Sequence, residues 1–149
     1  MKEYATIYIP DPSLVGSRVL DEIETIKSYS AISDNGKATG LHLTFEWGSI
    51  EISFLSSPDI EEHLKGLSGF MSQHITDTDT LVYTQARILC VRMALGCVIE
   101  YSIEYSDELL QEMVNELGVL TRVFAGMLFF LDYLYDFNGA PLRGIDHDV

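Results

Sequence analysis

Basic residues are scarce in this sequence: nine lysines and arginines stand against 23 aspartates and glutamates in 149 residues, a formal net charge of −14. A charge of that sign and size repels phosphate backbones and anionic lipid surfaces. The composition therefore argues against nucleic acid and membrane as partners. The same negative charge would attract a basic protein or a cationic small molecule, although acidity also serves simply to keep a protein soluble.

Cysteine is also scarce, with only Cys90 and Cys97, and no CxxC pair indicates a zinc site or a redox centre. We expect two buried thiols in a reducing compartment. The longest wholly apolar run, residues 123–131, is too short to cross a bilayer. The N-terminus lacks the continuous apolar region of a signal peptide, so a cytoplasmic protein is the default expectation.

Motifs that carry catalysis are missing as well. His74 with Asp77 and Asp79 could ligate a metal in a loop, but a polar connector would contain the same residues. The glycines of residues 65–69 fit neither a nucleophile elbow nor a phosphate loop. We therefore predict no cofactor and no metal, and an enzyme ranks third among the functions considered. The four histidines are scattered and none has ligand spacing: His42, His63, His74 and His147, the last in an expected frayed tail.

The residues that are present form the pattern of a single α+β domain over residues 1–149, with 47% hydrophobic residues to build a core. Alternation and capping signals predict an antiparallel sheet packed against about four helices. The expected elements are a strand over 4–9, a helix from Asp11 to about Ile26, a hairpin over 41–54, a helix from Asp59, a helix from Asp79 to Gly96, a strand over 97–104, a helix from Ser106 to Gly126, and a strand over 127–137 that returns through Leu142.

The order of these elements is repeated in two parts of the chain. Residues 3–56 and 97–142 each read strand-helix-strand-strand, and a helical pair over 58–95 joins them, which predicts a tandem pseudo-repeat. This order is similar to the tandem strand-helix-strand-strand modules of the GyrI-like small-molecule-binding domains. The resemblance concerns topology alone, and two central helices depart from it, so no residue roles are transferred.

The hairpin sequence LHLTFEWGSIEISF, residues 41–54, raises the question of a carboxylate pair. With Gly48-Ser49 as its two-residue loop, every large apolar side chain falls on one face, and Glu46 faces Glu51 on the other. Two facing carboxylates with His42 nearby could serve as acid and base if something covered them. Their neighbours are polar, so we expect a solvated sheet face that discourages edge pairing, with a recognition surface as the alternative.

Acidic residues are concentrated between Arg92 and Arg122, where no basic residue occurs. Three glutamates four residues apart are expected to line one ridge of a helix, where like charges repel by about 0.2–0.5 kcal/mol per pair. The ridge is either a solvated helix face or a docking stripe for a basic partner. The candidate partner-binding residues are Glu100, Glu104, Asp107, Glu108, Glu112 and Glu116.

Aromatic residues form a second concentration. The expected strand over 127–137 has too much apolar surface on both faces to be left in water, so one face must meet the core and the other a helix, a partner or a ligand. Tyrosines beside carboxylates also suit an organic cation, although core packing explains the same rings. The candidate ligand-binding residues are Tyr101, Tyr105, Tyr133, Tyr135 and Asp132.

Two functions remain open from the sequence. The first is a non-enzymatic acidic protein that binds a basic protein partner, in the manner of immunity proteins, antitoxins and inhibitors. The second is a small-molecule binding module for an aromatic or cationic ligand. A homodimer would suit an apolar edge strand over 127–137.

Overall fold

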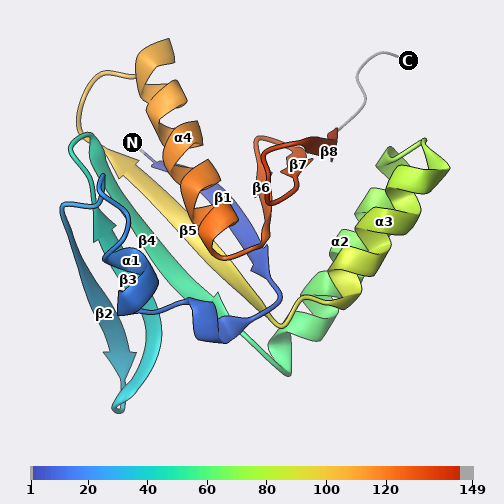
Figure 1. Cartoon of the computed structure of the whole chain (residues 1–149), viewed down its shortest axis with the longest axis horizontal. Helices are drawn as coiled ribbons and strands as arrows, with labels where there is room; N and C mark the ends of the chain where they lie inside the picture. Colours follow the sequence, from blue (N-terminus) through green and yellow to red (C-terminus); the bar gives the residue numbers. More distant parts are fainter. Residues whose placement is uncertain (1, 145–149) are drawn as a thin grey trace.

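The computed structural model describes residues 2–144 and folds them into an eight-stranded antiparallel sheet with four α-helices (Figure 1). The α+β class predicted from the sequence is confirmed. The strands are β1 (Lys2–Ile9), β2 (Ser28–Asp34), β3 (Lys37–Thr44), β4 (Gly48–Leu55), β5 (Met93–Tyr101), β6 (Met127–Phe130), β7 (Tyr133–Tyr135) and β8 (Pro141–Gly144), in the sheet order β2-β3-β4-β5-β1-β6-β7-β8. The helices are α1 (Ser17–Leu20), α2 (Asp59–His74), α3 (Thr78–Leu89) and α4 (Asp107–Val123), with a 3-10 turn, η1 (Pro12–Leu14), before α1.

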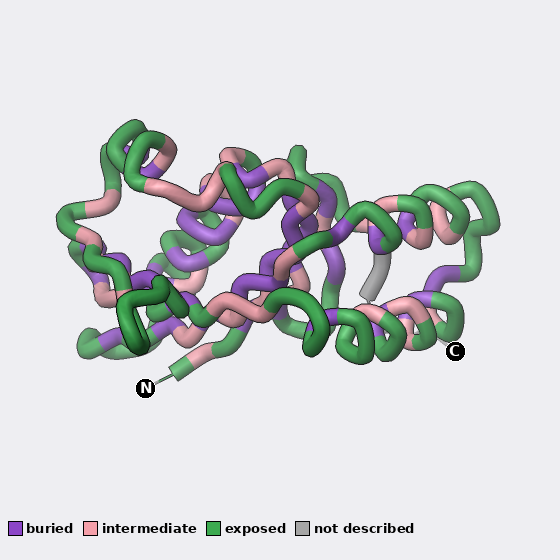
Figure 2. The backbone as a smooth tube through the Cα atoms, turned by 90° about the horizontal axis from the view of Figure 1, so that it is seen from below, coloured by how far each residue is buried: buried purple, intermediate pink, exposed green. Residues whose placement is uncertain are grey.

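Helices cover both faces of the sheet. Because successive side chains of a strand point to opposite faces, Ile7 joins the core under α1 and α4, while Tyr8 joins a second core under α2 and α3. Figure 1 shows α4 lying across the middle of the sheet and the α2–α3 pair extending from one end of it. Figure 2 shows the buried positions where these layers meet and the exposed outer faces of the helices.

The start of α4 predicted from the capping residue Ser106 is confirmed. The Ser106 hydroxyl accepts a hydrogen bond from the Leu109 amide, which satisfies a free N–H group at the start of α4. Asp77 caps α3 in the same way through the Thr80 amide, whereas the sequence predicted a start at about Asp79. The Ser106 cap fixes where α4 begins, and with it the position of the acidic ridge.

The helix predicted from Asp11 to Ile26 is wrong. Asp11 caps only the 3-10 turn, Gly16 is extended, and α1 has four residues. The apolar side chains at helical spacing do pack against the core, but they do so mostly from turns. The chain then forms β2, which pairs with β3 through a turn at Asn35 and Gly36, both with positive φ.

The helix predicted to reach Gly96 ends at Leu89, because residues from Met93 onward form β5. This strand lies between β4 and β1 and has buried residues on both faces, including Ala94 and Leu95. A strand covered on both sides loses the alternation that identifies strands in a sequence. The predicted strand over 97–104 therefore starts and ends too late.

The single strand predicted over 127–137 is wrong as well. Leu131 and Asp132 have φ of 52° and 67°, so the chain turns there and splits into β6 and β7. Two residues with positive φ match a tight hairpin turn, but the sequence has no Asn-Gly or Asp-Gly signal at this point. Since β8 rather than this segment forms the sheet edge, the homodimer stays a prediction without its original support.

The hairpin of β3 and β4 has a register different from the predicted one. His42 faces Glu51 and Leu43 faces Ile50, a displacement of four residues, because residues 45–47 form the connection instead of Gly48-Ser49. An even displacement keeps every side chain on its predicted face. Glu46 does not face Glu51, so the carboxylate pair does not exist.

The connections in the two halves of the chain differ. The β5–α4–β6 connection passes over one strand, β1, whereas β1 and β2 are separated by three strands. The single domain and the pseudo-repeat of 3–56 and 97–142 stay predictions. The tail that holds His147 lies outside the described residues.

Candidate functional site: an acidic groove beside α4

The acidic ridge of α4 is exposed only in its first part. Glu108 and Glu112 are exposed, whereas Glu116 is 8% exposed. Four residues exceed one helical turn of 3.6 residues by about 40°, so each step along the ridge rotates the next glutamate toward the sheet. The expectation that Glu116 lies on a solvated ridge is therefore wrong.

Glu116 accepts a hydrogen bond from a residue far away in the sequence. The Thr25 hydroxyl donates a hydrogen bond of 2.7 Å to Glu116 Oε2. Burial raises the pKa of Glu116, the Thr25 hydrogen bond lowers it, and the charge of Glu112 raises it further. The net shift is upward, so this carboxylate carries its charge less readily than an exposed glutamate.

Glu116 lies in the wall of a groove of about 520 Å³. Phe45 and Trp47 form an aromatic side of this groove, with ring centroids 5.3 Å apart and planes 9° from parallel. Both rings are nearly buried, and the Trp47 indole N–H has no hydrogen-bond acceptor among the described residues. The acidic groove, as we call it, is lined by Glu24, Thr25, Lys27, Phe45, Glu46, Trp47, Glu112, Asn115 and Glu116.

Negative charge dominates the acidic groove, which has four glutamates and one lysine in its lining. Lys27 is 3.3 Å from Glu46 in an exposed ion pair, so it offsets the charge of one glutamate at the rim. The groove can attract a cation through its remaining carboxylates.

Comparisons of the chain with known protein families, with curated proteins and with solved structures find no match. Within residues 2–144, no group of three or more histidine, cysteine, aspartate or glutamate side chains is arranged to hold a metal ion. No helix in that part of the chain has both the length and the apolar character needed to span a bilayer.

The other acidic candidates lie outside the acidic groove. Glu100 forms an ion pair of 3.2 Å with Lys2 on the neighbouring strand β1. Glu104 and Asp107 are exposed at the start of α4 and in the segment before it, where the helix dipole stabilises negative charge. The six residues therefore do not form one continuous stripe, and Glu112 and Glu116 are the two that the groove brings together.

The candidate tyrosines form two separate pairs. Tyr101 and Tyr105 have ring centroids 6.0 Å apart, and those of Tyr133 and Tyr135 are 6.4 Å apart. Tyr101 lines a small hollow with Glu100 and Lys2, while Tyr135 lines a different pocket beside α4. Asp132 is exposed in the β6–β7 turn. Binding of an aromatic cation stays a prediction for either pair.

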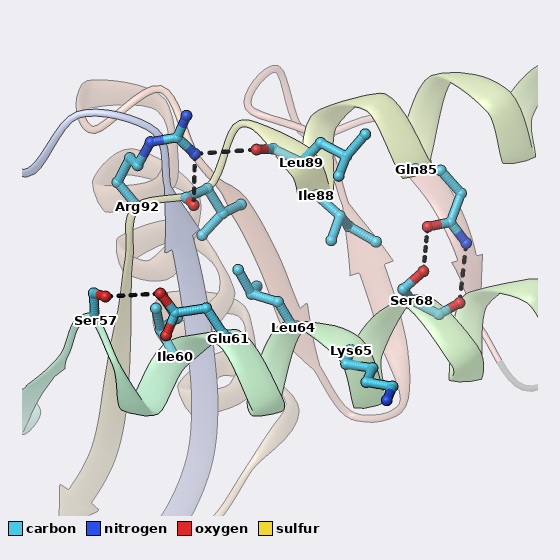
Figure 3. Close-up of a pocket in the computed structure, with 11 residues that line it drawn as sticks. Ser57, Ile60, Glu61, Leu64, Lys65, Ser68, Gln85, Ile88, Leu89 and Arg92 are labelled. Carbon is cyan, nitrogen blue, oxygen red and sulfur yellow. Dashed lines mark hydrogen bonds between the residues drawn. The ribbon is translucent and has the colours of Figure 1, made fainter.

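Another groove, of about 550 Å³, lies between α2 and α3 (Figure 3). Its polar groups mostly bond within the chain: Arg92 donates to the Leu89 carbonyl, and Ser68 donates to Gln85. Leu89 is 78% exposed at the end of α3. No charged group is buried here without a partner, so this groove gives a weaker chemical signal than the acidic groove.

Sequence reasoning missed the segments that complete the acidic groove. Alternation along 41–54 predicted that Phe45 and Trp47 share a face, and both are indeed buried. Nothing in the sequence placed Thr25 beside Glu116. The unfavourable spacing of three glutamates was the available signal, since a glutamate without a compensating neighbour indicates a partner elsewhere.

Proposed function

We propose that this protein binds a basic protein partner through the exposed glutamates of α4 and the adjoining acidic groove, without catalysing a reaction. The observation that carries this proposal is Glu116, a nearly buried carboxylate beside the like charge of Glu112 in an open groove. We also propose a cytoplasmic location, in keeping with two cysteines that form no disulfide.

A cationic side chain would improve the energetics of this groove. A lysine or arginine near Glu116 offsets the repulsion from Glu112 and favours the charged carboxylate. The flat guanidinium group of arginine can also form two parallel hydrogen bonds to one carboxylate. The glutamates that line the groove are not grouped as metal ligands within residues 2–144. A cationic side chain therefore suits the groove better than a metal ion.

The test is native mass spectrometry of the protein purified gently at low salt from its own cells. We expect a complex with a basic polypeptide that dissociates as the salt concentration rises, because exposed charge pairs are screened. The test variant is Glu108→Lys with Glu112→Lys, which reverses two exposed charges without touching the buried Glu116.

The matched control reverses two exposed glutamates on another helix, Glu61→Lys with Glu62→Lys in α2. The total change in charge is the same in both variants. We expect the α2 variant to keep the basic polypeptide and the α4 variant to lose it. Equal capture by both variants, or capture of an acidic polypeptide only, would contradict the proposal.

A further inference from the structure

We propose a second binding site, for a small neutral ring compound, in the pocket between α4 and the β6–β7 hairpin. The pocket has a volume of about 330 Å³. Its apolar lining comes from α4 and from both strands of the hairpin: Leu110, Val114, Leu128, Phe130, Leu131 and Tyr135. It is independent of the acidic groove and of the basic partner.

Gly118 leaves space for this pocket at a cost to the helix. It lies inside α4, where glycine is about 1 kcal/mol less favourable than alanine. A Cβ atom built at Gly118 meets no atom within 4 Å, so no close contact in the chain requires glycine there. A larger side chain at this position would instead enter the pocket that Gly118 lines.

Leu131 gives a second sign that the pocket is open for a ligand. It is 51% exposed and has a φ of 52°, a backbone conformation that costs a leucine about 1 kcal/mol. About half of this apolar side chain therefore faces water while its backbone keeps an unfavourable conformation. Against a bound ring compound, the same side chain would be buried.

The polar groups of the pocket determine that the ligand is neutral. Asp136 is 6% exposed, and its carboxylate already accepts from the Tyr83 hydroxyl and the Phe137 amide and lies 3.4 Å from Arg87 Nη2. The Thr121 hydroxyl donates to the Leu117 carbonyl within α4. No lining charge is therefore left to bind a cation, unlike in the acidic groove, and the Tyr135 phenol remains to orient the ligand.

The volume sets the size of the ligand. An apolar cavity of about 150 Å³ accommodates one benzene molecule, so about 330 Å³ accommodates two fused rings. The rings of Phe130 and Tyr135 in the lining favour an aromatic compound. Indole is a suitable probe, since it is neutral, flat and of this size.

The experiment is a titration of the full chain with indole, followed by NMR of its leucine and valine methyl groups. We expect the signals of Leu110, Val114, Leu128 and Leu131 to shift together, with one dissociation constant. Gly118→Leu fills the pocket and should weaken indole binding by about tenfold or more. Gly69→Leu is the control, because Gly69 is also helical with nothing within 4 Å of its Cβ, but lies in α2.

Circular dichroism melts show whether both variants fold, and Gly118→Val replaces Gly118→Leu if the latter does not. Methyl shifts spread over several regions, or unchanged binding by a folded Gly118 variant, would overturn the proposal. So would a dimer that dissociates to monomer on dilution and that accounts for the burial of these methyl groups. The variant Glu108→Lys with Glu112→Lys should lose the basic partner and still bind indole, because neither residue lines this pocket.

Discussion

Thr25 and Glu116 lie 91 positions apart in the sequence, yet the Thr25 hydroxyl donates a 2.7 Å hydrogen bond to Glu116 Oε2. This bond joins the segment before β2 to α4 and closes one wall of the acidic groove. It also explains how a glutamate in the middle of an acidic helix is tolerated next to the core.

Replacing Thr25 by valine tests how much this hydrogen bond contributes to the free energy of unfolding. Thr25→Val keeps the shape of the side chain and removes the donor, so we expect the free energy of unfolding to fall by about 1 kcal/mol at neutral pH. Thr25→Ser keeps the hydroxyl and should lose much less. Urea denaturation measures both, and equal losses would show that the hydroxyl group contributes no more to stability than the methyl group does.

Glu116→Gln tests the raised pKa of Glu116. A carboxyl whose pKa is higher in the folded than in the unfolded state holds its proton more tightly when folded, so its contribution to stability declines as pH rises from the ordinary glutamate pKa through the raised one. The advantage of Glu116→Gln over the natural chain should therefore grow across that interval. Urea denaturation from about pH 4 to about pH 8 measures it, and a constant difference would contradict the raised pKa.

Arg87 connects α3 to two other segments, because it pairs with Asp136 after β7 and donates to the carbonyl of Ala125 between α4 and β6. Arg87→Ala leaves the buried Asp136 carboxylate with less compensation, and we expect a loss of about 3 kcal/mol. A double-mutant cycle with Asp136→Asn separates the pair from other effects. If the two single losses simply add, the ion pair contributes nothing specific.

Gly40 and Gly96 are both strand glycines, but they differ in the space around them. A Cβ at Gly40 would lie 2.1 Å from the Ile52 carbonyl oxygen, whereas at Gly96 the nearest atom is 3.8 Å away. We expect Gly40→Ala to cost about 2 kcal/mol or more and Gly96→Ala to stay within about 0.5 kcal/mol. Thermal melts of both variants test this, and similar values would contradict the close approach of β3 and β4.

Leu131→Asn should stabilise the protein by about 1 kcal/mol, since asparagine tolerates the positive φ of 52° at this position. Leu131→Ala is the control, because it removes the same exposed side chain but keeps the conformational cost. We expect only the asparagine variant to melt at a higher temperature. A matching gain in both variants would attribute the effect to the lost side chain instead.

The sequence predicted some parts of this fold well for physical reasons. Caps such as Ser106 act locally, so the start of α4 could be read from a few residues. Alternation predicted which side chains of 41–54 are buried, and it did so even with the wrong register, because the true register differs by an even number of residues.

Features that depend on distant parts of the chain could not be predicted. The first residues of β5, 93–96, were assigned to a helix because the strand is covered on both faces, which only the complete sheet reveals. The turn at Leu131 and Asp132 needs positive φ at both residues, which aspartate tolerates but leucine rarely adopts, so composition gave no warning of it. The acidic groove depends on Thr25, Trp47 and Glu116 meeting, and no spacing rule connects three such segments.

Helix α4 lies between the two proposed sites. Glu112 and Glu116 face the acidic groove on one side of its buried stripe, and Val114 and Gly118 face the apolar pocket on the other. The two sites therefore share a helix but no lining residue. One helix supplies a wall to two sites of opposite character, a negatively charged groove and an apolar pocket.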